Sequence, residues 1–382
     1  MIDLVRIYVL WAPGSAEGAH VAELISRHFD GIGMERDGVA HRIPVRFRSE
    51  PWEPAGSHPR PIDLGQAAHN VIVFLHDLYS HLARDVWNTY VGDVRTAMEI
   101  RGEADLYVPF GSPGGHAFLS SDENLQYARR DRWQALPTIE AREARLLLHL
   151  LYAVREHLRG TLGRGEASER LFVSHAKADG DKTARAIVDY VNATDQDVPL
   201  QTFYDAKELS PGDDFAAEFD TAIRGGTLLA IVSDVYDSRP WCVFELTTAK
   251  RARRPIVLAD VGQVRTSRTY PYGANLPRVR ITPKEGETTW VERLLVETLS
   301  EGLRCDIFEA QATRALALAE VDRSGALILP RPPELFDVVE AVPSLSLIVY
   351  PDPPISVLER EILERATALA PALRLATLSE VR

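Results

Sequence analysis

The sequence of 382 residues is longer than a single hydrophobic core usually supports, which predicts two domains and a further small lobe. Hydrophobic residues make up 45% of the chain and charged residues 26%, a balance that argues against disorder. The formal net charge of -12 repels phosphate backbones and therefore argues against general nucleic-acid binding.

The sequence offers little sign of membrane, disulfide or metal chemistry. No apolar run approaches the length of a membrane-spanning helix, and the apolar start is too short to be a signal peptide and is interrupted by Asp3 and Arg6. The two cysteines, Cys242 and Cys305, show no paired spacing, and the 11 histidines show no metal-ligand spacing. We therefore expect a cytoplasmic protein without a membrane segment, metal or cofactor.

The first part of the chain predicts an α/β domain. The apolar run at 6–12 predicts a strand, and the amphipathic segment at 16–29 predicts a helix. A second buried strand begins at Asn70, a helix opens near Trp87, and a further strand ends at Gly111. A leucine-rich helix at 139–158 follows, and the Gly-rich stretch 159–169 predicts a linker. Near-continuous apolar strands alternating with helices indicate a parallel sheet covered on both faces.

The second part of the chain repeats this pattern. "RLFVSHA" at 170–176 matches "RIYVLWA" at 6–12, and an amphipathic segment follows at 182–193. The stretch 227–262 again contains a buried strand, an Asp-aliphatic-Tyr turn, a helix opening near Trp and a strand ending in Gly. A helix at 290–303 closes the second copy. The repeat predicts two flavodoxin-like, doubly wound parallel-sheet domains.

The chain after Cys305 follows a different pattern. Two segments, 326–341 and 345–366, each read as a strand, a Pro-x-Pro-Pro turn and a helix, with proline at the first helical turn. The run 373–378 predicts a third strand. We expect a small α/β extension that packs on the second domain, which gives domains at 1–160, 169–304 and 305–382.

Three segments of the second copy resemble the Toll/interleukin receptor (TIR) domain when taken together. They are "LFVSHA" at 171–176, "FYDAKELSPGDDF" at 203–215 and "IVSDVYDSRPWCVFEL" at 231–246. Their order and spacing are similar to those of the bacterial TIR family over about residues 169–303. The first domain then resembles a degenerate copy.

The resemblance implies one of two functions. Some TIR domains only assemble, and others break the nicotinamide-ribose bond of NAD. In the enzymes the glutamate of the Trp-Cys-x-x-Glu signature is catalytic, and the matching residue here is Glu245. A fixed carboxylate stabilises the positive charge that develops on the ribose, and neutral nicotinamide leaves without a general acid. NAD is then a substrate rather than a cofactor.

Further substrate-binding residues are expected around Glu245. Ser174, His175 and Lys177 follow the first strand of the second domain, at the edge where open parallel sheets bind ligands. A structural role for His175 is the alternative. The resemblance implies that Asp205 and Phe215 lie near the ribose and adenine.

The remaining features have ordinary structural explanations. Asp205 also fits a turn. Trp241 is counted among the NAD-binding residues, and it is expected to pack in the core and fix the helix that carries Glu245. The basic run at 250–254 suits a helix C-terminus, with phosphate contact as the alternative. The segment "FGSPGGH" at 110–116 lacks the spacing of a phosphate loop or a hydrolase elbow and is expected to be a loop.

The first copy has no acidic residue at the position that matches Glu245. Trp87 aligns with Trp241, which places Val91 where Glu245 stands, and Leu10 and Trp11 replace Ser174 and His175. This copy is expected to be inactive, and either to provide an assembly or sensing surface or to buttress the second domain.

The sequence therefore favours an NAD glycohydrolase of anti-phage defence. The resemblance implies activation as a homo-oligomer through TIR-TIR contacts, and a separate sensor protein is a further expected partner. The role in defence is an analogy with the family. A non-enzymatic TIR assembly module is the main alternative. A nucleoside hydrolase or deoxyribosyltransferase is a further one.

Overall fold

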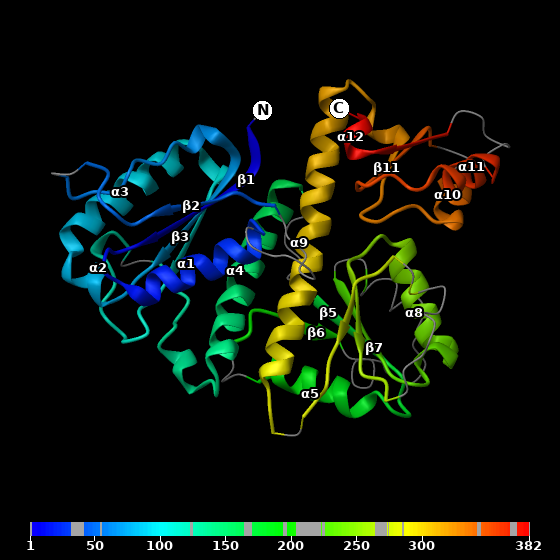
Figure 1. Cartoon of the computed structure of the whole chain (residues 1–382), viewed down its shortest axis with the longest axis horizontal. Helices are drawn as coiled ribbons and strands as arrows, with labels where there is room; N and C mark the ends of the chain where they lie inside the picture. Colours follow the sequence, from blue (N-terminus) through cyan, green and yellow to red (C-terminus); the bar gives the residue numbers. More distant parts are fainter. Residues whose placement is uncertain are drawn as a thin grey trace. The chain divides into compact units, whose positions relative to one another are not determined.

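The chain forms two compact units, each containing parallel β-sheet (Figure 1). The computed structural model describes residues 2–31, 42–53, 56–122, 125–163, 170–193, 197–203, 223, 226–263, 273, 275–284, 286–341, 345–366 and 373–381. Unit 1 comprises residues 1–165 and 291–300, and unit 2 comprises residues 166–290 and 301–382. The doubly wound α/β class predicted from the sequence is confirmed for the chain.

Unit 1 contains a four-stranded parallel sheet in the order β2-β1-β3-β4. Its strands are β1 (Asp3–Trp11), β2 (Val45–Arg48), β3 (Ala67–Leu75) and β4 (Leu106–Phe110). Its helices include α1 (Ala16–Phe29), α2 (Leu78–Leu82), α3 (Arg84–Ile100) and α4 (Ile139–Thr161). The side chain of Ser15 caps α1 by accepting from the Gly18 N–H, as serine does at many helix N-termini.

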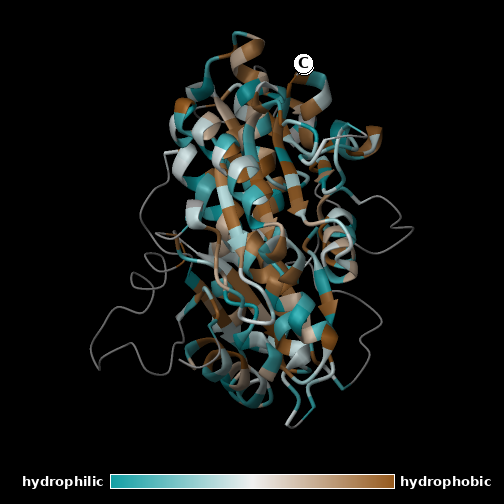
Figure 2. Ribbon diagram, turned by 90° about the vertical axis from the view of Figure 1, so that its left-hand side faces the viewer, coloured by the Kyte–Doolittle hydropathy of each residue, from teal (hydrophilic) through white to brown (hydrophobic). Residues whose placement is uncertain are grey.

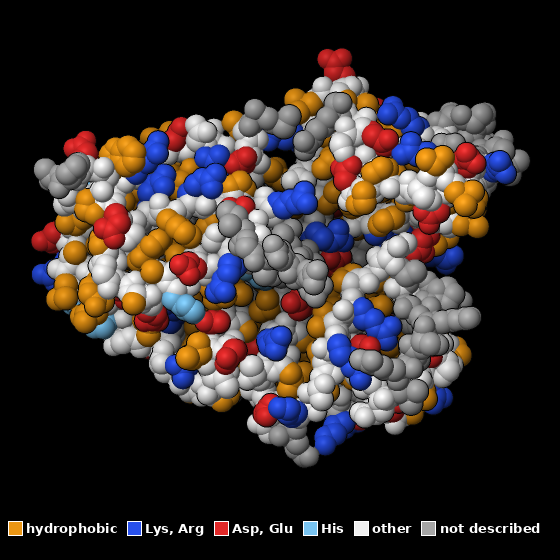
Figure 3. Space-filling view, viewed as in Figure 1, with side chains coloured by type: hydrophobic (Ala, Val, Ile, Leu, Met, Phe, Trp, Pro, Cys, Tyr) orange, Lys and Arg blue, Asp and Glu red, His pale blue; other side chains and the backbone are white. Residues whose placement is uncertain are grey.

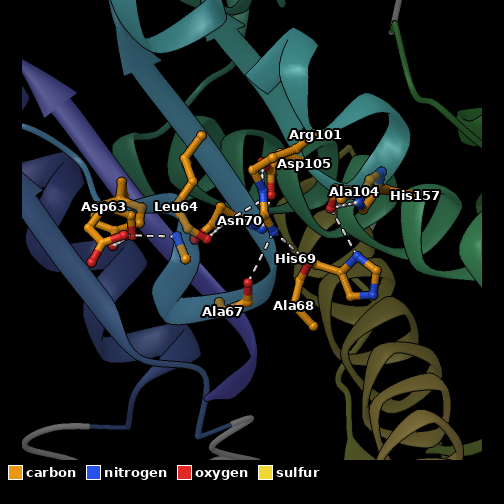
Figure 4. A network of polar contacts seen from close by, with 12 residues as sticks. Asp63, Leu64, Ala67, Ala68, His69, Asn70, Arg101, Ala104, Asp105 and His157 are labelled. Carbon is orange, nitrogen blue, oxygen red and sulfur yellow. Dashed lines mark hydrogen bonds and ion pairs between the residues drawn. The ribbon is translucent and has the colours of Figure 1, made fainter. Parts of the chain in front are cut away.

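A polar network joins the start of β3, the segment just before β4 and α4 within unit 1 (Figure 4). The fully buried Asn70 side chain donates to Asp105 Oδ1 at 2.8 Å, and Arg101 Nε donates to Asp105 Oδ2 at 2.7 Å. Ring nitrogens of His69 and His157 lie 2.9 and 3.2 Å from the carbonyl oxygen of Ala104. Asn70 Oδ1 accepts no hydrogen bond, but the other contacts link the start of β3 to α4 through the carbonyl of Ala104.

Unit 2 contains a five-stranded parallel sheet in the order β6-β5-β7-β8-β9. The strands are β5 (Arg170–His175), β6 (Gln201–Phe203), β7 (Thr227–Val232), β8 (Ile256–Asp260) and β9 (Arg278–Arg280). The described helices beside this sheet include α5 (Asp181–Asn192) and α8 (Pro240–Arg251). The first four strands follow the same order as in unit 1, which supports the repeat seen in the sequence.

The buried faces of α3 and α8 shift the sequence alignment by one residue. Buried core positions are Trp87, Val91 and Val94 on α3, and Cys242, Leu246 and Ala249 on α8. Both sets have spacings of four and three residues. Val91 therefore corresponds to Leu246, and the expected match of Trp87 with Trp241 is wrong. Tyr90 then occupies the position of Glu245.

The chain after residue 318 adds a three-stranded parallel sheet to unit 2, in the order β10-β11-β12. Its elements are β10 (Ala326–Ile328), α10 (Leu335–Ala341), β11 (Leu347–Tyr350), α11 (Val357–Ala366), β12 (Arg374–Thr377) and α12 (Leu378–Val381). The predicted third strand is confirmed. The Pro-x-Pro-Pro segments differ from expectation, because Pro332 and Pro333 precede the first residue of α10 rather than lying in its first turn.

Helix α9 (Thr289–Leu318) is continuous over 30 residues and contributes to both units. In unit 1, Arg145 of α4 forms a buried ion pair with Glu292, and the hydroxyl of Ser300 lies 3.1 Å from a ring nitrogen of His28. The helix expected at 290–303 as the end of the second domain is thus longer, and its segment 291–300 belongs to unit 1.

The strands are the most hydrophobic elements, whereas the helices carry both hydrophobic and hydrophilic residues (Figure 2). All six residues of β7 are buried, as expected for a central parallel strand with both faces covered. In the described parts of the chain, no helix combines the length and hydrophobicity needed to cross a bilayer.

Candidate functional site

The Glu245 carboxylate lies at the carboxyl end of β5. Glu245 belongs to α8 and is 5% exposed, and Ser174 is the second-last residue of β5. The Ser174 hydroxyl donates to Glu245 Oε2 at 2.5 Å and lies 2.7 Å from the Tyr236 hydroxyl. Since Ser174 has one proton and gives it to Glu245, Tyr236 must donate to Ser174. The three side chains form a directed chain of hydrogen bonds that ends on the carboxylate.

The topology explains why this position suits a ligand. β5 lies between β6 and β7, so the segments that follow β5 and β7 leave the sheet at the point where the strand order reverses. Open α/β sheets bind ligands at such a switch point. Asp179 joins the two segments by accepting from the Ser233 hydroxyl at 2.5 Å and from the Val235 N–H at 3.2 Å.

The surroundings of Glu245 are largely apolar. Its helical neighbours Cys242, Leu246 and Ala249 belong to the buried core cluster that includes Ala176 and Tyr236. Burial raises the pKa of the Cys242 thiol to about 12, and the neighbouring Glu245 carboxylate acts in the same direction. A carboxylate in such a low-dielectric setting interacts strongly with any positive charge brought close to it.

The other residues expected after β5 differ in exposure. His175 is 9% exposed, and its Nε2 lies 3.5 Å from Asp181 Oδ1 in the first turn of α5. Lys177 is exposed in the turn between β5 and α5. The structure thus places Ser174 against Glu245, and His175 beside Asp181.

Trp241 does not pack in the core, and this expectation is wrong. Its side chain is 58% exposed, and its ring meets that of Phe244 edge-on with centroids 5.7 Å apart. The buried face of α8 begins at Cys242, and successive helical residues are rotated by about 100°, which turns Trp241 away from the sheet. Trp241 therefore cannot fix α8 by core packing.

Two expected substrate residues, Asp205 and Phe215, lie outside the described residues. Two contributors were missed by sequence reasoning. Tyr236 is the last residue of the Asp-aliphatic-Tyr turn noted in the sequence, but nothing in that turn indicates its contact with Ser174. Asp179 had no sequence signal, because its partners follow a different strand.

The basic run at the end of α8 holds the C-terminal part of unit 2. Lys250 is 2% exposed and its Nζ lies 2.5 Å from Glu334 Oε1, while Arg251 pairs with Glu340 at 3.2 Å. Lys250 and Arg251 thus have carboxylate partners from the chain itself. These ion pairs support the expectation that the C-terminal extension packs on the second domain.

Charges of both signs are mixed on the face of the molecule drawn in Figure 3. On the face drawn in Figure 3, Lys and Arg side chains are interspersed with Asp and Glu side chains and hydrophobic groups. Within the described ranges, no three His, Cys, Asp or Glu side chains are grouped as metal ligands would be.

Unit 2 therefore contains a doubly wound α/β domain, with a buried carboxylate at the switch point of its five-stranded sheet. Residues 171–295 match the family model described as the TIR domain, so the chain contains a TIR domain. This match confirms the resemblance carried by the three sequence segments.

The other comparisons add no functional information. No curated protein matches the chain. Among solved structures, the tagatose-6-phosphate ketose/aldose isomerase from Escherichia coli is 12% identical, over 80% of this chain and 82% of the isomerase chain. Its TM-score of 0.22 is too low to support an argument about fold or activity.

The corresponding edge of unit 1 has no acid at the position of Glu245. Tyr90 is 5% exposed there, and its hydroxyl donates to the carbonyl oxygen of Arg60 at 2.8 Å. Leu10, fully buried, and Trp11 stand where Ser174 and His175 stand in the repeat. The residues at these three positions carry no charge that could stabilise a sugar cation.

Proposed function

We propose that the TIR domain of this chain is an NAD glycohydrolase with Glu245 as its catalytic residue. One observation carries the proposal: the Ser174 hydroxyl holds the Glu245 carboxylate at the switch point of the sheet, in apolar surroundings. A carboxylate fixed in this way stabilises the positive charge that develops on the ribose as its bond to nicotinamide lengthens.

The reaction needs one carboxylate. The bond between ribose C1′ and the nicotinamide nitrogen breaks, and its electron pair moves to that nitrogen, which becomes neutral. Water then bonds to C1′ and loses a proton, giving nicotinamide, ADP-ribose and a proton. If an adenine nitrogen attacks C1′ instead of water, the product is a cyclic derivative. A neutral leaving group needs no general acid, in contrast to an O-glycoside.

NAD binding and access to Glu245 form part of the same proposal. Ser174, His175, Lys177 and Trp241 contact the substrate, and Asp205 and Phe215 lie near the ribose and adenine. Because Glu245 is 5% exposed, a rearrangement must open a path to its carboxylate. Assembly into a homo-oligomer in the cytoplasm provides that trigger, with a separate sensor protein as a further input, and the setting is anti-phage defence.

A second function competes for the same residues. Glu245 is nearly buried and bonded to Ser174, which also suits a carboxylate that only stabilises the domain. The chain would then be a non-enzymatic TIR assembly module.

Nicotinamide release separates the two functions. Full-length protein is incubated with NAD at high concentration under crowding, and assembly is followed in parallel by light scattering. We expect release by the assembled protein, and a loss of about 100-fold or more in Glu245→Gln, which keeps the shape but removes the charge. Glu287→Gln is the matched control, since Glu287 is exposed in unit 2 and pairs with Lys284. Assembled wild-type protein that releases no nicotinamide would identify the assembly module. Release of the free base from nucleosides supplied in place of NAD would identify a nucleoside hydrolase.

A further inference from the structure

Unit 1 contains a cavity of about 330 Å³ that the TIR chemistry does not use. Its lining comes from α1, from the segment after β4 and from α4. Glu17 lies in the first turn of α1, directly after β1. Arg130, also in the lining, donates to the carbonyl oxygens of Gly111, at the end of β4, and His76, at the end of β3. The cavity therefore lies at the carboxyl edge of the unit 1 sheet, where open α/β folds bind ligands.

The charged groups of the lining leave one cation without a carboxylate. Glu17 Oε1 lies 3.1 Å from Arg130 Nη1, and Glu143 Oε1 lies 2.5 Å from His20 Nε2. Arg142 Nη1 instead donates to the neutral amide of Gln134 at 3.3 Å, and among the described residues no carboxylate lies within ion-pair distance of Arg142. Glu17 thus pairs with Arg130 and Glu143 contacts the His20 ring, and no carboxylate of the described lining lies beside the Arg142 guanidinium.

Two buried donors of the lining have no acceptor in the described structure. They are the indole Nε1 of Trp133, a residue that is 3% exposed, and Nε of Arg142. A buried N–H without an acceptor is unfavourable, and both atoms are covered in this structure, so the lining has to shift slightly before a bound group accepts from them. An acceptor that also carries negative charge would pair with Arg142 at the same time.

The rest of the lining is apolar. Val21 and Leu24 come from α1, and Ile139 and Leu146 come from α4. Small-molecule sites commonly combine such an apolar wall with a few polar groups that fix orientation.

We propose that this cavity binds a small amphipathic organic anion. Its anionic oxygens accept from Arg142 and from the indole N–H of Trp133, and its apolar body contacts Val21, Leu24 and Leu146. Unit 1 is then a ligand-binding domain. This role is independent of NAD cleavage in unit 2.

Fluorine NMR of the full-length protein labelled with 5-fluorotryptophan tests the site directly. The Trp133 resonance is assigned with Trp133→Phe. The probe is 3-phenylpropionate, and its neutral analogue 3-phenylpropanamide is the control. We expect the anion to shift the Trp133 resonance in a saturable manner, and the amide to bind at least about tenfold more weakly, because it lacks the charge.

Matched arginine variants complete the test. Arg142→Gln should raise the dissociation constant for 3-phenylpropionate at least about tenfold, whereas Arg132→Gln, at an exposed position outside the lining, should leave it unchanged. The proposal is overturned by an unshifted Trp133 resonance at the highest soluble probe concentration, by equal binding of the two probes, or by Arg142→Gln binding as wild type. None of these results depends on nicotinamide release.

Discussion

Ser174 and Glu245 are 71 residues apart in the chain, yet the hydroxyl of one donates to the carboxylate of the other at 2.5 Å. The contact ties the end of β5 to the middle of α8. It brings the glutamate of the Trp-Cys-x-x-Glu signature to the carboxyl end of β5.

Ser174→Ala should destabilise the TIR domain, because it removes a buried donor from the Glu245 carboxylate. We expect the free energy of unfolding, measured with urea, to fall by about 1–3 kcal/mol. Tyr236→Phe removes the hydroxyl that donates to Ser174 and leaves the carboxylate bonded, so its cost should be smaller, about 1 kcal/mol. Equal stability of Ser174→Ala and wild type would contradict the contact.

Lys250 should contribute far more to stability than its neighbour Arg251. Lys250→Met leaves the carboxylate of Glu334 partly buried without its closest cation, and the expected loss is up to about 3 kcal/mol. Arg251→Met breaks an ion pair whose two side chains are 64% and 54% exposed, so the expected loss is below about 1 kcal/mol. Urea unfolding of both variants, followed by circular dichroism, gives the comparison. Similar losses in the two variants would show that Glu334 does not depend on Lys250.

Neither cysteine should react while the protein is folded. Cys242 is 3% exposed and its pKa is raised to about 12, and Cys305 is 6% exposed. Because the thiolate is the reactive form, a thiol-specific reagent at neutral pH should label both residues only after denaturation. Mass spectrometry of native and urea-treated samples counts the modified thiols. Rapid labelling of Cys242 in the native protein would mean that α8 opens easily.

Unit 1 should lose stability on mild acidification. Burial lowers the pKa of His28 from 6.5 to about 4, and it also lowers the pKa values of His76 and His157. As the pH falls below about 6.5, His28 becomes protonated in the unfolded chain, whereas in the folded protein it stays neutral until about pH 4. Stability is therefore greatest above this window and falls through it.

The contribution of His28 to this acid effect can be isolated. Between about pH 7 and pH 5, His28 should account for at most about 2 kcal/mol of the lost free energy of unfolding. His28→Gln cannot titrate, so its loss over the same interval should be smaller by that amount. Urea unfolding at the two pH values makes the measurement, and an identical loss in the variant would exclude His28 as a source.

The sequence was informative wherever the structure depends on local pattern. The apolar runs at 170–176 and 227–232 predicted β5 and β7, and the amphipathic segment 16–29 coincides with α1. The repeat predicted the shared strand order of the two sheets. Each of these strands and helices arises from residues that are close together in the chain.

Features that depend on distant partners were not predictable. Lys250 resembled a solvated cation at a helix end, because its partner Glu334 lies 84 residues further on. Trp241 resembled a core residue, because the sequence did not show that the buried face of α8 begins one position later, at Cys242. The same one-residue uncertainty misaligned Trp87. Tertiary contacts decided these cases.

The sharing of α9 between the units has a consequence for dissecting the protein. Unit 1 is not a contiguous stretch of chain, since residues 291–300 belong to it and supply the Glu292 partner of the buried Arg145 guanidinium. A polypeptide that stops at the 159–169 linker would lose this carboxylate and the ion pair that joins α4 to α9. Separate expression of unit 1 should therefore include residues 291–300, or replace Arg145 by an uncharged side chain.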